Sequence, residues 1–528
     1  MKFKELTDDN VQTLSSIFND KSLPWDERME LMKNITGKQE RTTRKWLVKL
    51  KISKSKEEIS PQYAEAKKRK ANKNTKRFLV TWGQCNTKPH ETFIDNLEAY
   101  AKFLSADLHV IAGRYRNPTS LEGMHTAQQG ESWHSRLLPY LDANRHDIHK
   151  YLSILSDIKT QPTATNPMSG MAGVSGVNSC IFGSPKLQME MIPVLESNKP
   201  KMMLTTGACT VKNYTDSKAG KKGEFHHTLG FVVVEIEDKD TFHVRQVSAD
   251  DNGNFIDLFH EVKDGKLTKV NECAAIVLGD LHVGHHDPQV IKSTLKLMNK
   301  LKPEHTILHD VFDGRSISHH EAKDPFLQYS KEFHNLNDLG DEISEMMDVL
   351  SEFEKFPNVV IVRSNHDDFL DRWLKLNDWR NQSTPKNNKL YMDFAHRLMN
   401  QYEKHPHKVL GVIPELITDK FPKFQTLGRG DSYKVLGWEL GHHGDMGSNG
   451  SRGSLLSFRK LNTKVIVGHY HSCGRMDGAL AVGTSTYLRV GYNKGASGWL
   501  NSHVIIHKNG KAQHINFIGK NKGYTTLK

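Results

Sequence analysis

Short apolar runs recur in the second half of the chain, and each ends in a cluster of polar residues. Short apolar runs bounded in this way predict buried strands. Because strand ends meet at one edge of an open α/β sheet, we expect the polar residues that follow them to gather in one site. The five runs are Ala274 to Leu278, Thr306 to Leu308, Val359 to Val362, Leu436 to Leu440 and Lys464 to Val467.

The polar clusters are rich in carboxylate, imidazole and amide side chains, which bind metals. A mixed Asp, His and Asn shell suits Mn²⁺, Fe or Zn²⁺ better than Ca²⁺. Two such ions roughly 3.5–4 Å apart can activate a hydroxide and stabilise charge on a phosphoryl group. The five motifs are Asp280-Leu-His282, His309-Asp310-Val-Phe-Asp313-Gly-Arg315, Ser364-Asn365-His366-Asp367, His442-His443-Gly444-Asp445 and Gly468-His469-Tyr-His471.

These motifs resemble those of the calcineurin-like metallophosphoesterases, whose pattern is D-x-H, G-D-x-x-D-R, G-N-H-D/E, H-G and G-H-x-H. The resemblance implies a four-layer αββα sandwich over residues 269–528, with two divalent metal ions, Mn²⁺ ahead of Mg²⁺, Fe or Zn²⁺. It also implies a role for each matching residue. Asp280, His282 and His471 would bind one metal, Asn365, His443 and His469 the other, and Asp310 would bridge them. His366 would be the general acid, oriented by Asp367, and Arg315 would hold a phosphate oxygen.

The chain departs from the family pattern at three positions. His309 and Ser364 stand where the family has glycine, and Gly314 displaces Arg315 by one residue. None of these changes removes a predicted ligand, but the last one shifts Arg315 out of the family spacing. His319 and His320 follow the second motif closely, and either could line the cleft or lie on the surface.

The region before these motifs predicts a second α/β domain over residues 78–268. Phe78 to Thr81 indicates a strand, and Glu91 to Leu104 has apolar residues at helical spacing. Leu108 to Ile111 indicates the next strand, so the segment starts as a β-α-β unit. The sequence assigns no chemistry to this domain.

The first 55 residues predict a small helical domain. Helices are expected over 8–18, from Pro24 onward and over 40–50, with a Gly-containing turn at 35–38. This order is typical of a helix-turn-helix that binds DNA, and a small bundle used for oligomerisation is the alternative. A basic linker follows over 56–77. The DNA-binding candidates are Arg41, Thr43, Arg44, Lys45, Lys49, Lys68 and Arg69.

The net charge of +12 is concentrated at one end of the chain. Residues 1–77 contain 20 Lys and Arg against 11 Asp and Glu, a difference of +9, so the remaining residues contribute only +3. A basic block beside a phosphoesterase favours a polyanionic substrate such as DNA. The five cysteines lack C-x-x-C spacing, and no apolar segment has the length of a membrane span. We therefore expect a cytoplasmic protein that acts on DNA, without a membrane partner, as a homo-oligomer.

The leading hypothesis is a metal-dependent DNase that cleaves phosphodiesters with a two-metal-activated hydroxide. The layout resembles large metallophosphoesterases encoded by tailed phages, which implies degradation of host DNA, or DNA processing, in the host cytoplasm. One alternative is a phosphoprotein or nucleotide phosphatase that uses the same site. Another is a DNA-binding regulator or scaffold without catalysis.

Overall fold

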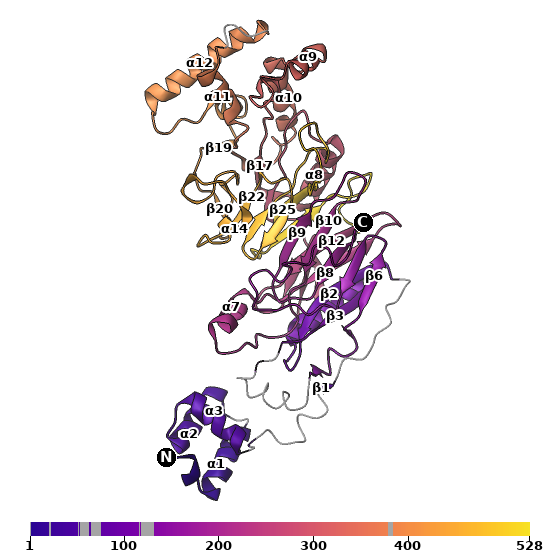
Figure 1. The fold of residues 1–528 in the computed structure, drawn as a ribbon, viewed down its shortest axis with the longest axis vertical. Helices are drawn as coiled ribbons and strands as arrows, with labels where there is room; N and C mark the ends of the chain where they lie inside the picture. Colours follow the sequence, from indigo (N-terminus) through magenta and orange to yellow (C-terminus); the bar gives the residue numbers. More distant parts are fainter. Residues whose placement is uncertain are drawn as a thin grey trace.

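The computed structural model describes residues 2–20, 23–50, 52, 63–64, 75–115, 117, 131–378 and 384–527. The described part of the chain is mixed α/β (Figure 1). The predicted basic linker lies largely outside the described residues, and Lys68 and Arg69 with it. No helix in the described ranges combines the length and the apolar character needed to cross a membrane.

The N-terminal helices lie where the apolar spacing predicts them. They are α1 (Asp8–Asn19), α2 (Trp25–Thr36) and α3 (Glu40–Lys49), and the turn before α3 places Gly37 at φ 62°. A positive φ favours glycine because it has no Cβ. The bundle has its own small core of Leu14, Phe18, Met29, Met32, Leu47 and Ile52.

The middle region contains a five-stranded sheet in the order β12-β11-β2-β3-β5. The β-α-β prediction is confirmed, since β2 and β3 are parallel and α5 (Glu91–Leu104) connects them. Phe93, Leu97 and Tyr100 of α5 belong to the same buried cluster as Phe231 and Phe255. The strands are β2 (Arg77–Gln84), β3 (Asp107–Gly113), β5 (Leu141–Asp142), β11 (Gly230–Ile236) and β12 (Phe242–Ser248).

A six-stranded sheet carries the first three motifs, in the order β19-β18-β17-β16-β25-β26. Helices α8 (Pro288–Leu301), α10 (Leu339–Ser351), α11 (Asp368–Leu376), α12 (Lys386–Lys404) and α13 (Val412–Lys420) share one core with one of its faces. The strands are β16 (Cys273–Val277), β17 (Pro303–His309), β18 (Val359–Val362), β19 (Gln425–Leu427), β25 (Ser502–Ile506) and β26 (Ala512–Asn516).

A ten-stranded sheet draws its strands from both sides of the boundary predicted at residue 268. Its two halves join where Arg475 of β23 pairs with Met189 of β9. In order, the strands are β20 (Lys434–Val435), β21 (Trp438–Glu439), β22 (Lys464–Val467), β24 (Ala479–Ala481), β23 (Gly474–Met476), β9 (Gln188–Ile192), β10 (Lys201–Thr205), β8 (Ser179–Phe182), β7 (Leu152–Leu155) and β6 (Arg145–His149).

The five- and six-stranded sheets lie next to each other on one face of the ten-stranded sheet. Leu480 and Met189 both pair with Arg475, which places them on that face. Leu480 shares a core with the six-stranded sheet, and Met189 shares another with the five-stranded sheet. At the junction, Asn516 of β26 donates a hydrogen bond to the carbonyl of Val244 in β12. The two predicted α/β domains therefore share one continuous sheet.

The fourth predicted strand begins later than its apolar run. Leu436 has φ 46° and forms a tight turn with Gly437, so β21 starts only at Trp438. The opposite face of β22 and β24 carries the four-residue helix α14 (Leu455–Phe458), whose Phe458 packs on Val465 and Ala479. Further elements are α7 (Lys218–His226), α9 (Pro325–Phe333), β1 (Tyr63–Ala64), β4 (Trp133–His134), β13 (Phe255–Asp257), β14 (His260–Lys263) and β15 (Lys266–Lys269).

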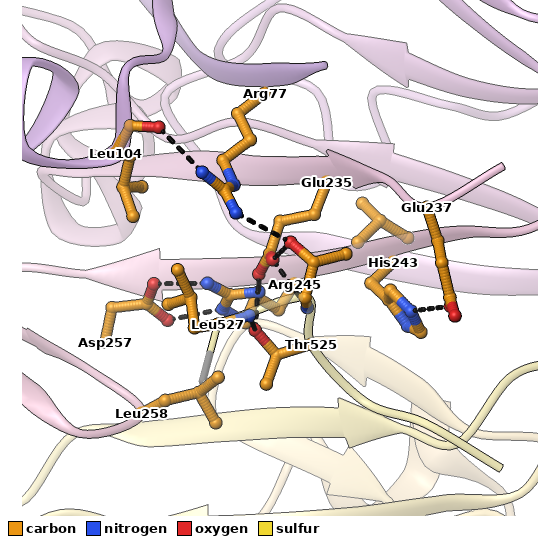
Figure 2. A network of polar contacts seen from close by, with 12 residues as sticks. Arg77, Leu104, Glu235, Glu237, His243, Arg245, Asp257, Leu258, Thr525 and Leu527 are labelled. Carbon is orange, nitrogen blue, oxygen red and sulfur yellow. Dashed lines mark hydrogen bonds and ion pairs between the residues drawn. The ribbon is translucent and has the colours of Figure 1, made fainter. Parts of the chain in front are cut away.

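A buried charge network ties the C-terminal end of the chain to the middle region (Figure 2). Arg245 forms a two-bond ion pair with Asp257, at 2.6 and 2.7 Å, and a second ion pair with Glu235. Thr525 and Thr526 hydrogen-bond the Glu235 carboxylate. All three charged side chains are at most 2% exposed. The last described residues are thus an integral part of the fold.

Candidate metal centre

The polar motifs meet because five strands end at the same edge of the two packed sheets. Asp280, Asp310 and Asn365 follow the neighbouring parallel strands β16, β17 and β18. His443 and His469 follow β21 and β22, which are parallel neighbours in the ten-stranded sheet. Four of the candidate ligands have positive φ, namely His282, Asp310, His469 and His471. Such strained backbone costs on the order of 1–3 kcal/mol per residue and is concentrated at functional sites.

One group of four buried side chains is close enough to hold a metal ion. Ligand atoms of Asp280, His282, Asp310 and His471 all lie within 4.8 Å of one another. The His471 Nε2 atom is 3.1 Å from Asp280 Oδ2, and His282 Nε2 is 3.3 Å from Asp310 Oδ2. This group contains every residue predicted for the first metal, together with Asp310.

Asp310 is also contacted from the side of the second predicted set. His443 Nε2 lies 3.1 Å from Asp310 Oδ2, and the His443 and His469 ring centroids are 5.3 Å apart. The Asn365 Oδ1 atom is buried. Asp310 therefore sits between His282 and His443, the position that a bridging carboxylate would occupy.

Several buried atoms of the site lack a hydrogen-bond partner within the described residues. They are Oδ1 of Asp280, of Asp310 and of Asn365, both ring nitrogens of His309 and Nδ1 of His443. An unsatisfied buried polar group costs about 1–3 kcal/mol, so this concentration in one place is unusual for a purely structural cluster. Converging, unsatisfied oxygen and imidazole donors are what divalent ions require, and the residues present fit them.

The electrostatics of the site are those of paired carboxylates and imidazoles. Burial opposes ionisation of Asp310, but His443 and His282 hold its pKa well below the ordinary value. Burial also opposes protonation of His443, yet Asp310 raises its pKa to about 9. Metals bind the neutral imidazole, so binding here would displace protons from the histidines.

His366 is oriented by Asp313, which corrects the prediction that Asp367 orients it. The Nδ1 of His366 lies 2.7 Å from the Asp313 carbonyl, so Nδ1 donates and Nε2 is left for other contacts. The Asp367 carboxylate instead accepts hydrogen bonds from the backbone N–H and the hydroxyl of Ser364. Asp367 closes the turn between β18 and α11, and Ser364 is its partner there.

Asp313 is a site residue to which the sequence reasoning gave no role. Its Oδ1 lies 3.0 Å from His282 Nδ1, while His282 Nε2 faces Asp310. A carboxylate on the far nitrogen fixes the tautomer and orientation of a metal-binding histidine. The D-x-x-D spacing of Asp310 and Asp313 in the second motif was the available signal.

Gly468 and His309 occupy two positions at which the family has glycine. Both lie next to candidate ligands. A Cβ at Gly468 would lie 2.4 Å from Asp280 Oδ1, so any larger residue would displace that carboxylate. His309, which replaces a family glycine, is fully buried with its ring 5.5 Å from that of His443. Burial, followed by the charge of His443, lowers the pKa of His309 to about 4, which keeps it neutral.

Arg315 is already paired with an acidic residue. Its Nη2 lies 2.6 Å from Glu345 Oε2, and its guanidinium packs on Gly284, two residues beyond His282. The loop that carries it is fixed by Glu342, which accepts hydrogen bonds from the backbone N–H groups of Arg315 and Ser316. A phosphate contact by Arg315 stays a prediction.

The DNA-binding candidates of the N-terminal bundle differ in exposure. Arg41, Lys45 and Lys49 are exposed, whereas Arg44 pairs with Glu40. Thr43 is buried, with its hydroxyl 2.9 Å from that of Thr36, so it joins α2 to α3 and does not belong to an exposed recognition face. Its short polar side chain at helical spacing made it indistinguishable from its neighbours in the sequence.

A second His/Asp group lies in the middle region and was missed by the sequence reasoning. Atoms of His109, Asp142 and His146 come within 4.8 Å of one another. His146 Nε2 pairs with Asp142 at 2.6 Å, and His109 Nε2 lies 2.9 Å from the Ser156 hydroxyl. The residues come from three separate strands with no shared motif, so no local pattern could reveal them.

A buried histidine supports the backbone in front of Asp280. His503 Nδ1 accepts a hydrogen bond from the Gly279 N–H at 2.9 Å, and its Nε2 lies 2.7 Å from the Thr294 hydroxyl. Protonation of Nδ1 would direct its new N–H at the Gly279 N–H. Burial accordingly lowers the pKa of His503 to about 3.

We expect the chelator-treated protein to lose stability as the pH falls below about 6.5, with His503 contributing. The unfolded chain binds a proton at this histidine below that pH, but the folded chain does not until about pH 3. Each such group makes the free energy of unfolding fall by about 1.4 kcal/mol per pH unit. Urea unfolding between pH 6 and 4 should show a shallower slope for His503→Gln. His396→Gln, on the exposed side of α12, is the matched control, and equal slopes for the two variants would contradict the assignment.

Comparison with known proteins gives one clear relative. No protein-family model matches the chain, and no solved structure matches it. The chain is 31% identical over 478 residues to Protein A1 of Escherichia phage T5, a match that covers 84% of this chain and 82% of the relative. The chain therefore belongs to the family of phage T5 Protein A1.

Proposed function

We propose that this protein is a two-metal phosphodiesterase of the calcineurin-like type that cleaves DNA. The observation that carries the proposal is the placement of Asp310 between His282 and His443, among buried oxygens and ring nitrogens without hydrogen-bond partners. The two facing sheets, with helices packed outside the six-stranded one, agree with the predicted αββα sandwich. Its fourth layer would be reduced to the short α14 and the loops around it.

The chemistry divides between the ions and the side chains. Two divalent ions bound here would supply a nucleophile at neutral pH and Lewis acidity toward the phosphoryl oxygens. Asp310 would hold both ions, and Asp313 would keep His282 in the tautomer that binds through Nε2. His366 would protonate the leaving 3′ or 5′ oxygen through Nε2, because its Nδ1 is held by the Asp313 carbonyl. Burial and then His282 lower the pKa of His366 to about 4, so it would take its proton only when the phosphodiester anion is bound.

DNA is proposed as the substrate because the basic charge is concentrated in residues 1–77, as is usual for a segment that follows a polyanion. A phage protein that acts on DNA would do so in the host cytoplasm, where host and phage DNA are both accessible. The same site on a phosphatase would need no such segment.

The proposal is tested with linear and circular duplex DNA and an aryl phosphate monoester, each with Mn²⁺, Mg²⁺ or chelator. We expect cleavage of DNA in Mn²⁺, none in chelator, and little release from the monoester. Hydrolysis of the monoester alone would make the protein a phosphatase. Tight DNA binding with no turnover in any metal would make it a regulator.

We expect the exposed basic residues of α3 to contact phosphates. A triple variant with glutamine at Arg41, Lys45 and Lys49 should bind DNA more weakly. The slope of log K against log salt should decrease in magnitude by up to about 0.9 for each phosphate that is no longer neutralised. Fluorescence anisotropy over a salt series measures this slope. The control replaces Lys292, Lys296 and Lys300, all exposed on α8, by glutamine. An unchanged slope in the α3 variant would assign the bundle to assembly.

A further inference from the structure

A pocket of about 420 Å³ lies at the end of the packed sheets opposite the metal centre. Strands β21 and β22 begin at its wall with Trp438 and Lys464, and their other ends lead to His443 and His469. The pocket therefore has no residue in common with the metal site. Its volume is within the roughly 300–1,000 Å³ that small-molecule sites occupy.

The feature that distinguishes this pocket is a buried arginine that forms no ion pair with a carboxylate in the described part of the chain. Arg475 lies in β23, on the face covered by the other two sheets, and is 7% exposed. Its Nε has no hydrogen-bond partner among the described residues, and its Nη1 reaches only the Ala512 carbonyl, at 3.5 Å. Burial lowers the pKa of the Arg475 guanidinium to about 10. A buried, unpaired cation is costly unless something anionic occupies the space beside it.

Asp477, the acidic residue of the pocket wall, favours the charge of Arg475 but does not offset the effect of burial on its pKa. Asp477 is already paired with Arg459 at 2.6 Å and lies 3.5 Å from His226. Lys464 and Lys511 line the same space, and burial, followed by Lys464 and Arg475, lowers the pKa of Lys511. Asp250 and Asp251 act on Lys511 in the opposite sense from outside the pocket wall. The cations that line the pocket therefore exceed its one carboxylate.

We propose that this pocket binds a phosphate-bearing ligand of mononucleotide size. Arg475 would hold the phosphate with its planar fork, with Lys464 and Lys511 as further charge partners. Phe225, which is 82% exposed and lines the pocket, offers a face on which a base can stack. The proposal does not depend on the metal centre, because the two sites share no residue.

Calorimetric titration of the full chain tests the pocket. Chelator is present so that phosphate cannot bind to metal ions at the metal centre. The ligands are deoxyadenosine 5′-monophosphate, inorganic phosphate and deoxyadenosine. We expect the nucleotide and phosphate to bind and the nucleoside to bind at least about tenfold more weakly. Equal affinity for phosphate and nucleotide would support the phosphate site at Arg475 but overturn the stacking of a base on Phe225.

The variants are Arg475→Met and the double variant Lys464→Met with Lys511→Met, with the exposed Lys423→Met as the control. We expect nucleotide affinity to fall at least about tenfold in both pocket variants and to stay unchanged in the control. The lysine variant keeps the buried Arg475 in place, so its result can be interpreted even if Arg475→Met does not fold. The proposal would be overturned if the lysine variant and Arg475→Met both bound the nucleotide with wild-type affinity. It would also be overturned if the wild-type protein gave no heat with any phosphate ligand at millimolar concentration.

Discussion

Replacement of Asp310 by asparagine is expected to lower metal-dependent cleavage of DNA by at least about 100-fold. Loss of a residue that only supports a metal ligand costs about 10- to 100-fold, so loss of a carboxylate that holds the metal itself should cost no less. Asp310 is fully buried and is approached by His282 at 3.3 Å and by His443 at 3.1 Å. The amide keeps the shape of the side chain but removes the negative charge that both histidines face.

A second readout separates loss of metal from loss of fold. Mn²⁺ should raise the unfolding temperature of the wild-type protein, since a ligand that binds only the folded state stabilises it. This shift should largely disappear in Asp310→Asn, while metal-free Asp310→Asn should still unfold cooperatively, at a temperature lowered only by loss of the buried Asp310–His443 pair. Asp419→Asn is the matched control, because Asp419 is exposed and pairs with Arg397 on the surface. Wild-type DNA cleavage by Asp310→Asn with Mn²⁺ would refute the assignment of the centre.

The gathering of the ligands was predictable because it depends on strand order and strand ends. Asp280, Asp310 and Asn365 each follow an apolar run, and parallel strands bring such positions to one edge whatever the details of the loops. The partner of His366 was not predictable in the same way. Asp367 is its neighbour in the chain, but the turn after β18 directs that carboxylate to Ser364 and leaves His366 to the Asp313 carbonyl. The group that orients His366 therefore depends on the direction of single side chains, which the pattern of apolar runs does not give.

Local sequence patterns also could not predict that the two α/β regions share one sheet. The pairing of Met189 with Arg475 joins residues that are far apart in the chain, and alternation of polar and apolar residues does not identify a partner strand. Arg475 itself looks like an ordinary exposed position of a short strand. It is buried only because the five- and six-stranded sheets meet over it.

The largest expected effect on stability outside the metal centre is that of Arg245→Met. Arg245 is 2% exposed and neutralises Glu235 and Asp257, which are both fully buried. Glu235 and Asp257 would remain in place with only neutral donors, including Tyr100 and Thr525. Removal of one member of a buried ion pair costs about 3–5 kcal/mol, because the remaining charge has no partner. We expect a decrease of this size in the free energy of unfolding, measured in urea at neutral pH.

Arg397→Met is a closely matched control for this prediction. Arg397 also bridges two carboxylates, Asp393 and Asp419, but these are more than half exposed, so its loss should cost no more than about 1 kcal/mol. The pH dependence gives an independent check. Burial opposes ionisation of Glu235, yet Arg245 lowers its pKa to about 2, so its stabilising effect is present above the unfolded pKa near 4.3 and is lost as the pH falls toward 2. In Arg245→Met the pKa of this carboxylate should rise, so the stability gap to wild type should narrow as the pH falls below 5. A gap no larger than that of Arg397→Met, or one that widens in acid, would mean that the buried network contributes little to the fold.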